Sequence, residues 1–227
     1  MKVTRALGVE GARTATGVVV VIDVIRAFSV SAYAFAGGAR QCLLVPTVEE
    51  ARALAEETPD AVVSAEVDTL PIDGIAISNS PTQIIQADLR GRALVQRTSA
   101  GTPVISAVGV GHDIFAASLV VARATAQACL LRKPDAVTLV ASGDFPEDHA
   151  CALYMESLIN GTPDAATVEE LLQPLYASER YRRFAAGDWP GFPKTDLDLA
   201  LVPDRFDFAM PATRAERCVR LLMQRPG

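Results

Sequence analysis

An uninterrupted run of β-branched residues near the start of the chain limits the possible folds more than any other feature. Residues 18–22 read Val-Val-Val-Val-Ile, and Asp23 follows them directly. A strand buried on both faces has such a run because neither face meets water, and these strands occur in parallel sheets covered by helices. The run therefore predicts a central parallel strand that ends at a carboxylate.

Strand-like and helix-like segments alternate along the chain to about residue 160. Gly37-Gly38 ends the first predicted helix, and Thr47-Val-Glu-Glu50 is a capping box that opens the second. The alternation favours an α/β fold with three layers, α/β/α, around a mainly parallel sheet, followed by a helical and extended C-terminal segment. The expected strands are 18–22, 41–45, 61–65, 93–96, 115–119 and 136–141, the expected helices are 27–37, 47–57, 102–108, 121–131 and 148–159, and beyond them 162–192 has a helical, polar pattern, 188–193 forms a stiff turn and 197–211 has an extended pattern.

Composition and charge exclude several classes of function. The 227 residues are half apolar and carry no repeat or low-complexity linker, so we expect a single compact domain over 1–227, or two closely packed lobes. The net charge of −6 and the lack of a basic stripe argue against a nucleic-acid partner. No early apolar run is long enough for a membrane span or a signal peptide, so we expect a cytoplasmic protein with reduced cysteines and no membrane partner. The apolar helix expected at 121–131 could pack internally or form a homodimer contact.

Four short polar motifs follow apolar runs, where a strand should end or a helix should begin. In open α/β sheets, ligands bind at this edge. The motifs supply carboxylates, an arginine, hydroxyls and a glycine-bearing turn, so together they predict a site for a phosphate and a divalent cation. They are Asp23-Val-Ile-Arg26, Ser78-Asn-Ser-Pro81, Thr98-Ser-Ala-Gly-Thr102 and Glu147-Asp148.

The acidic residues of this set are candidate metal ligands. Asp23, at the end of a predicted strand, can bind a cation that bridges to phosphate, and Arg26 could hold two phosphate or sulfonate oxygens. The alternative is an aspartate that caps a helix and pairs with the arginine. Glu66 with Asp68 suits a hard cation or a water-activating base, although Asp68 could equally belong to a solvated loop. The 147–148 pair could complete the metal site or simply favour a helix N-terminus.

The hydroxyl-rich motifs are candidate phosphate-binding segments. In the 98–102 motif, Gly101 lets backbone amides turn inward at the start of a helix, where the partial charge is positive. Arg97 could add charge there or face solvent. The 78–81 motif offers hydroxyl and amide donors around an oxyanion, or an ordinary helix cap and turn.

The order and spacing of these motifs resemble the 2-phosphosulfolactate phosphatase family over nearly the whole chain. The resemblance implies a magnesium-dependent acid phosphatase that converts phosphosulfolactate to sulfolactate and phosphate, a step of coenzyme M biosynthesis in methanogens. Many bacterial members have no such pathway, which leaves their substrates open. The resemblance rests on Ile22-Asp-Val-Ile-Arg-Ala27, Glu66, Ile72-Asp-Gly74, the 78–81 and 98–102 motifs and Glu147-Asp148, and it extends to Tyr181-Arg-Arg183 and 196–211.

The chain departs from the family pattern at three positions. The family has an arginine after its glutamate, where this chain has Val67 after Glu66. Family asparagines are replaced by Ala100 and Val121. A cation that would meet an anionic substrate is therefore missing, and Arg97 could replace it from the neighbouring loop.

These patterns predict a magnesium-dependent phosphatase that acts on a small anionic phosphoester, and the resemblance implies 2-phosphosulfolactate or a related compound as its substrate. Asp23-Val-Ile lacks the Asp-x-Asp pattern of aspartate-nucleophile phosphatases, which favours direct attack by water and leaves a covalent route open. The alternatives are a non-catalytic binding protein for an anionic metabolite, and a protein in which every motif is a cap or turn. The candidate catalytic residues are Asp23, Arg26 and Glu66, the candidate Mg²⁺ ligands are Asp23, Glu66 and Asp148, and the candidate substrate-binding residues are Arg26, Asn79, Ser80, Arg97, Thr98, Ser99, Gly101, Thr102 and Ser118.

Overall fold

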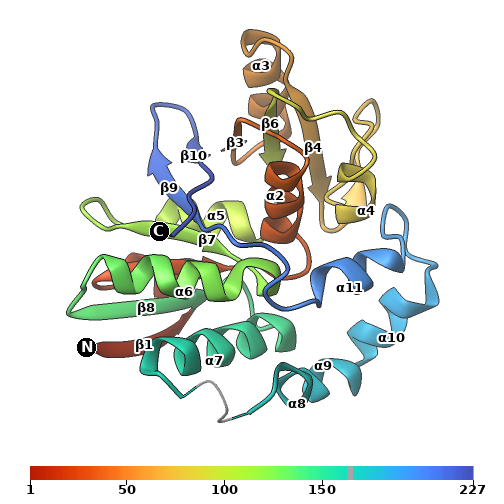
Figure 1. Ribbon diagram of the computed structural model, residues 1–227. Helices are drawn as coiled ribbons and strands as arrows, with labels where there is room; N and C mark the ends of the chain where they lie inside the picture. The colour runs from red at the N-terminus through yellow and green to blue at the C-terminus, as the bar shows by residue number, and fades with distance from the viewer. Residues whose placement is uncertain (163–165, 227) are drawn as a thin grey trace.

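The computed structural model describes residues 1–162 and 166–226 (Figure 1). Within these residues the strands form one ten-stranded, mostly parallel sheet flanked by helices, in the order β1-β8-β2-β7-β9-β10-β3-β6-β4-β5, which confirms the predicted α/β class. The strands are β1 (Lys2–Leu7), β2 (Val18–Ile22), β3 (Gln41–Leu44), β4 (Val62–Val67), β5 (Leu70–Pro71), β6 (Ala93–Arg97), β7 (Ile114–Ala117), β8 (Ala136–Ala141), β9 (Met210–Arg214) and β10 (Val219–Leu221). The helices are α1 (Gly8–Arg13), α2 (Ala27–Ala36), α3 (Val48–Glu57), α4 (Pro81–Ile84), α5 (Gly101–Ala107), η1 (Leu119–Val121), α6 (Ala122–Leu131), α7 (Pro146–Asn160), α8 (Val168–Leu171), α9 (Gln173–Tyr176), α10 (Glu179–Ala186) and α11 (Thr195–Ala200).

Two sets of parallel strands make up the sheet, and the β9–β10 hairpin joins them. β1, β8, β2 and β7 form one parallel set, and β3, β6 and β4 form the other. β9 pairs antiparallel with β7 and with β10, and β10 pairs antiparallel with β3. In Figure 1, β4 and β6 stand upright while β8 lies across the view. The change of direction brings strand ends from both sets toward α2.

β2 is buried on both faces, as its sequence predicts. All five of its residues are buried. Val19 and Val21 belong to one hydrophobic cluster together with Phe28 of α2, whereas Val20 belongs to a second cluster together with Met155 of α7. Because alternate side chains of a strand point to opposite faces, the sheet has a core on each side, and the end of β2 is held rigidly between them.

Several predicted boundaries match the structure closely. The strands over 18–22 and 136–141 are confirmed. The capping box is also present: Glu50 N donates to Thr47 Oγ1 over 3.1 Å, and Thr47 N donates to Glu50 Oε2 over 3.1 Å. Gly37 follows the last residue of α2, as predicted.

Two predictions about the later chain need correction. The strand predicted over 115–119 ends at Ala117, and the next residues turn into η1 because Asp204 and Phe206 donate backbone hydrogen bonds to the carbonyls of Leu119 and Val120. The extended segment predicted over 197–211 begins instead as α11, whose Asp196 accepts three hydrogen bonds from other elements and anchors the first turn.

The helical pattern over 162–192 corresponds to α8, α9 and α10, while its part over 163–165 lies outside the described residues. No helix in the described chain is long and apolar enough to cross a membrane.

Candidate active site

A cavity of about 360 Å³, here called the strand-end cavity, lies where β2, β4 and β6 end. Asp23 follows β2, Glu66 is the second-last residue of β4, and the 98–100 turn follows β6. Helix α10 and the loop after it supply the opposite wall. The cavity is lined by Asp23, Ile25, Arg26, Glu66, Asp68, Thr69, Asn79, Thr98, Ser99, Ala100, Phe145, Arg180, Phe184, Trp189 and Phe192.

Asp23 is 3% exposed, and its two carboxylate oxygens have different surroundings. Oδ1 accepts a 2.9 Å hydrogen bond from Ala27 N, so the capping role that the sequence left open is real. Oδ2 accepts no hydrogen bond from the described residues and keeps some solvent contact. Burial, together with the charges of Glu66 and Glu147, raises the pKa of Asp23 from 3.8 to about 6. An opposite charge at Oδ2 would therefore be strongly stabilising.

Glu66 fastens the 98–100 turn to the end of β4. Its Oε1 accepts a 2.6 Å hydrogen bond from Ser99 N, and its Oε2 accepts bonds from Thr69 N at 2.5 Å and Ser99 Oγ at 3.2 Å. A carboxylate offers about four lone-pair positions, so Glu66 retains capacity for a cation. Asp68 is exposed in the neighbouring turn, where its backbone N donates to Ser99 Oγ.

Arg26 does not pair with Asp23. Its Nη1 donates to Asp196 Oδ2 and to the Gly191 carbonyl, each over 2.8 Å, and its guanidinium lies 4.2 Å from the centre of the Phe192 ring. Nη2 is buried without a hydrogen-bond partner among the described residues. Arg26 therefore stands in the cavity wall with one donor group uncommitted, which suits it to an anion.

The residues of the 78–81 motif have two different roles, because one is a buried helix cap and another lines the cavity. Ser80 is fully buried, caps α4 by accepting from Gln83 N, and donates to Asp196 Oδ1 over 2.8 Å. Asn79 lines the cavity, and its Oδ1 accepts a 3.0 Å hydrogen bond from Gln96. The helix-cap interpretation describes the observed contacts of Ser80, whereas Asn79 reaches the cavity.

Asp148 lies behind the cavity wall. Its Oδ1 accepts from Val24 N at 2.8 Å, and its Oδ2 accepts from Ser142 N at 3.2 Å and Ser142 Oγ at 2.8 Å, so it ties the loops after β2 and β8 together. Burial, together with the charges of Asp23 and Glu147, raises its pKa well above 3.8. Over 1–162 and 166–226, no three or more His, Cys, Asp or Glu side chains are grouped to hold a metal ion. The structure thus brings Asp23 and Glu66 to the cavity and leaves Asp148 outside it.

The remaining predicted residues surround the site. Gly101 is required by close packing, because a Cβ there would lie 2.8 Å from Asp23 Oδ2. Thr102 is buried and shares a 3.0 Å hydrogen bond with Thr98, which lines the cavity. The Arg97 guanidinium donates to the backbone carbonyls of Pro46 and Glu66 and does not line the cavity. Ser118 is buried directly after Ala117, whose carbonyl accepts from Asp23 N, but it is not among the residues that line the cavity.

Sequence reasoning missed the C-terminal wall of the cavity. Arg180 lies between the rings of Phe145 and Phe184, with its guanidinium 4.2 Å and 4.8 Å from their centres. Trp189 adds an indole Nε1 that is buried without a partner among the described residues. The available signal was the density of aromatic and arginine residues over 180–192, in a segment that its polar pattern described only as helical.

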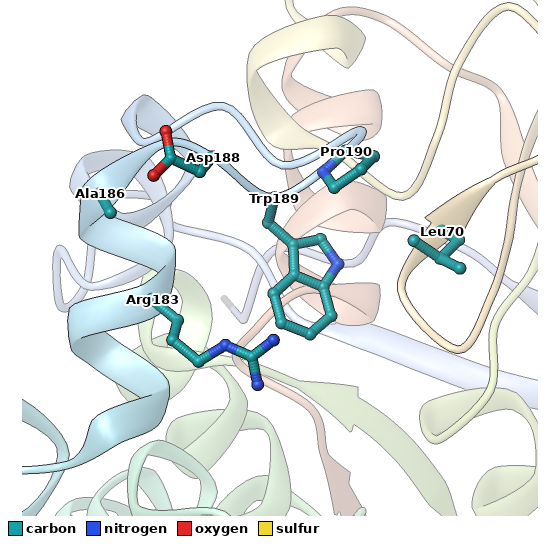
Figure 2. A pocket seen from close by; sticks show the side chains of 6 residues that line it. All are labelled: Leu70, Arg183, Ala186, Asp188, Trp189 and Pro190. Atoms are coloured by element: carbon teal, nitrogen blue, oxygen red, sulfur yellow. The ribbon is translucent and has the colours of Figure 1, made fainter.

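Trp189 lines both the strand-end cavity and a second cavity of about 390 Å³, which Figure 2 shows. Figure 2 shows the Arg183 guanidinium against the indole, at 4.3 Å from the ring centre, with Leu70 on the opposite side of the space. The indole is thus part of the wall of both cavities.

Comparisons with known proteins identify the family of this chain and several relatives. The model of the family described as 2-phosphosulpholactate phosphatase matches residues 6–185. A protein of Bacillus subtilis (strain 168) named probable 2-phosphosulfolactate phosphatase is 34% identical over 197 residues, which cover 84% of this chain and 85% of that protein. A Clostridium acetobutylicum protein of the same name is 33% identical over 140 residues, 60% of each chain. A third, from Deinococcus radiodurans, is 32% identical over 127 residues, 56% of this chain and 53% of its own length.

Proposed function

The chain belongs to the 2-phosphosulfolactate phosphatase family, whose members are phosphoric monoester hydrolases, and we propose that it hydrolyses a small anionic phosphoester such as 2-phosphosulfolactate in a magnesium-dependent reaction. One observation carries the proposal: two carboxylates, Asp23 and Glu66, share a cavity with the uncommitted donor of Arg26 and with the 98–100 turn. Carboxylates with cationic and hydroxyl donors are the components of a metal-assisted phosphate site.

The charge around the strand-end cavity supports a divalent cation. A polyanionic substrate would be repelled by the carboxylates unless a cation offset them. Mg²⁺ is commonly bound by one or two carboxylates together with water and substrate phosphate, so Asp23 and Glu66 fit it without a third acidic ligand. The carboxylates buried at or behind the wall are Asp23, Glu66, Glu147, Asp148 and Asp196, and the arginines that line the cavity among the described residues are Arg26 and Arg180.

When bound, Mg²⁺ would supply a Lewis acid that neutralises charge on the phosphoryl group. Phosphoryl transfer depends mainly on positioning and electrostatic stabilisation, and the side chains of the cavity would supply both. Arg26 Nη2 and the hydroxyl of Thr98 would hold the phosphoryl oxygens. The rings of Phe184 and Phe192 stack at 4.0 Å and limit access of bulk water from the C-terminal wall.

The direct test measures phosphate release from 2-phospho-3-sulfolactate with Mg²⁺ and then with excess chelator. We expect turnover that requires Mg²⁺ and that Asp23→Asn abolishes. Asp198→Asn is the matched control, because Asp198 is exposed on α11 and lies outside the cavity lining. Turnover that persists in the chelator would refute the magnesium requirement.

A non-catalytic binding protein is distinguished in the same experiment. The wild type would then bind 2-phospho-3-sulfolactate in a calorimeter and release no phosphate under any metal condition. Phosphate release from another phosphoester but not from 2-phospho-3-sulfolactate would support the phosphatase activity and reject the proposed substrate.

A further inference from the structure

A second arginine reaches the strand-end cavity from the C-terminal wall. Arg180 projects from α10, and its Nε donates to Glu147 Oε1 over 3.1 Å. Glu147 is completely buried, whereas the Arg180 side chain is 26% exposed. Glu147 therefore holds Nε, Nη2 donates to the Ile25 carbonyl over 3.5 Å, and the side chain lines the cavity.

Two aromatic rings fix the plane of this guanidinium. Phe145 precedes α7 and Phe184 lies one turn after Arg180 on α10, and both rings lie within 5 Å of the Arg180 guanidinium carbon. Nη1 makes no hydrogen bond to the described residues and is not buried. A guanidinium held in this way presents its free edge to an anion with little further loss of side-chain freedom.

The two cavity arginines occupy different surroundings. Arg26 is held by Asp196 and Gly191 beside the loop after β2, whereas Arg180 is held by Glu147 at the start of α7. Arg97, the cation that the sequence offered, does not line the cavity, and its guanidinium donates to the carbonyls of Pro46 and Glu66 and to Ser99 Oγ. Arg180 is thus the cavity arginine that is placed to bind an anionic group of the substrate other than the phosphoryl group.

We propose that Arg180 binds a carboxylate or sulfonate of the leaving group, and thereby selects phosphoesters that carry a second anionic group. The proposal rests on the proposed phosphatase function and adds a specificity-determining residue to it. Glu147 and Phe145 act as positioning residues, since both contact the Arg180 guanidinium and neither needs to contact the substrate.

Three substrates separate this role from a general loss of activity: 2-phospho-3-sulfolactate, 2-phospholactate and isopropyl phosphate, which has no second anionic group. Arg180→Gln should raise KM about 10- to 100-fold for the first two, the value of one or two lost charge-assisted hydrogen bonds. The loss for isopropyl phosphate, which offers Arg180 no anionic group, should be much smaller than for the other two. Arg180→Lys should recover part of the affinity, because it restores the charge without the fork.

Arg182→Gln is the matched control, because Arg182 is exposed on the same helix and lines no part of the cavity. Thermal melting of all three variants checks folding. Equal losses on all three substrates, or unchanged KM on all, would overturn the proposal.

Calorimetric binding of sulfolactate in the presence of Mg²⁺ provides a readout that needs no turnover. Wild type is expected to bind it and Arg180→Gln to bind it at least about tenfold more weakly. A wild type that releases phosphate from none of the esters but binds sulfolactate through Arg180 would refute the phosphatase and retain the anion-binding role. Failure of both measurements would refute both.

Discussion

Asp23 combines a buried carboxylate with a pKa raised from 3.8 to about 6, chiefly by burial. Replacing it with asparagine removes the charge and keeps the side-chain oxygen that accepts from Ala27 N. The folded protein no longer has to hold this negative charge beside Glu66 and Glu147. We therefore expect Asp23→Asn to stabilise the metal-free protein at neutral pH, while it abolishes turnover.

The magnitude follows from the pKa shift. A group whose pKa is higher in the folded than in the unfolded protein destabilises the folded state as it ionises. The contribution of the neutral Asp23 carboxyl to the free energy of unfolding is therefore fully present below pH 3.8, and it is lost as the pH rises through 6. A shift of about two units corresponds to about 3 kcal/mol at 1.36 kcal/mol per unit. Asparagine does not ionise, so the variant should gain about that amount at pH 7 and almost nothing at pH 4.

The assay is urea unfolding of wild type and Asp23→Asn in chelator, at several pH values between 4 and 7. The difference between the two free energies of unfolding isolates Asp23 from the other titrating groups. Asp198→Asn, at an exposed position on α11, should show no pH-dependent difference from wild type. A variant less stable than wild type at pH 7, or a difference that does not change with pH, would refute the reasoning. Added Mg²⁺ should raise the midpoint of wild type and leave that of Asp23→Asn unchanged.

Four further substitutions, one of them a control, test other parts of the structure. Asp196→Asn breaks the buried ion pair with the site arginine and should cost about 3–5 kcal/mol in urea unfolding, whereas Arg217→Ala removes an exposed pair and should cost less than about 1 kcal/mol. Gly101→Ala places a Cβ 2.8 Å from Asp23 Oδ2 and should lower kcat/KM by at least about tenfold while costing about 1–3 kcal/mol; unchanged kinetics would show that the carboxylate position is unimportant. Thr47→Ala removes the capping box of α3 and should cost about 1 kcal/mol with no effect on kinetics.

The parts of the fold that sequence predicts are those with a strong local signal. β2 is recognisable because it is apolar throughout, and α3 because its cap is formed by Thr47 and the residue three positions later. β1 has no such signal: it pairs with β8 alone at the sheet edge, and its residues are exposed or only partly buried. β9 and β10 pair with each other, and they join the sheet through β7 and β3, which are far away in the sequence.

The same distinction applies to the site. Asp23, Glu66 and Thr98 could be predicted because the carboxyl ends of strands are where ligands bind in α/β sheets. Arg180 could not, because the packing that brings α10 over these strand ends depends on contacts between distant segments. The ion pair of Arg26 with Asp196 spans 170 residues, and neither residue has a local pattern that identifies the other.

The buried carboxylates explain why this arrangement requires a ligand. Each of Asp23, Glu147 and Asp148 has its pKa raised by burial, and the charges of its neighbours add to the shift of Asp23 and Asp148. A fold selected for stability alone would place neutral side chains there, since buried like charges destabilise it. A cation and an anionic substrate bound together would reverse the cost, because the carboxylates hold the cation while Arg26 and Arg180 hold the anion. The electrostatic cost of gathering these carboxylates is therefore the physical counterpart of the binding energy that the proposed reaction would use.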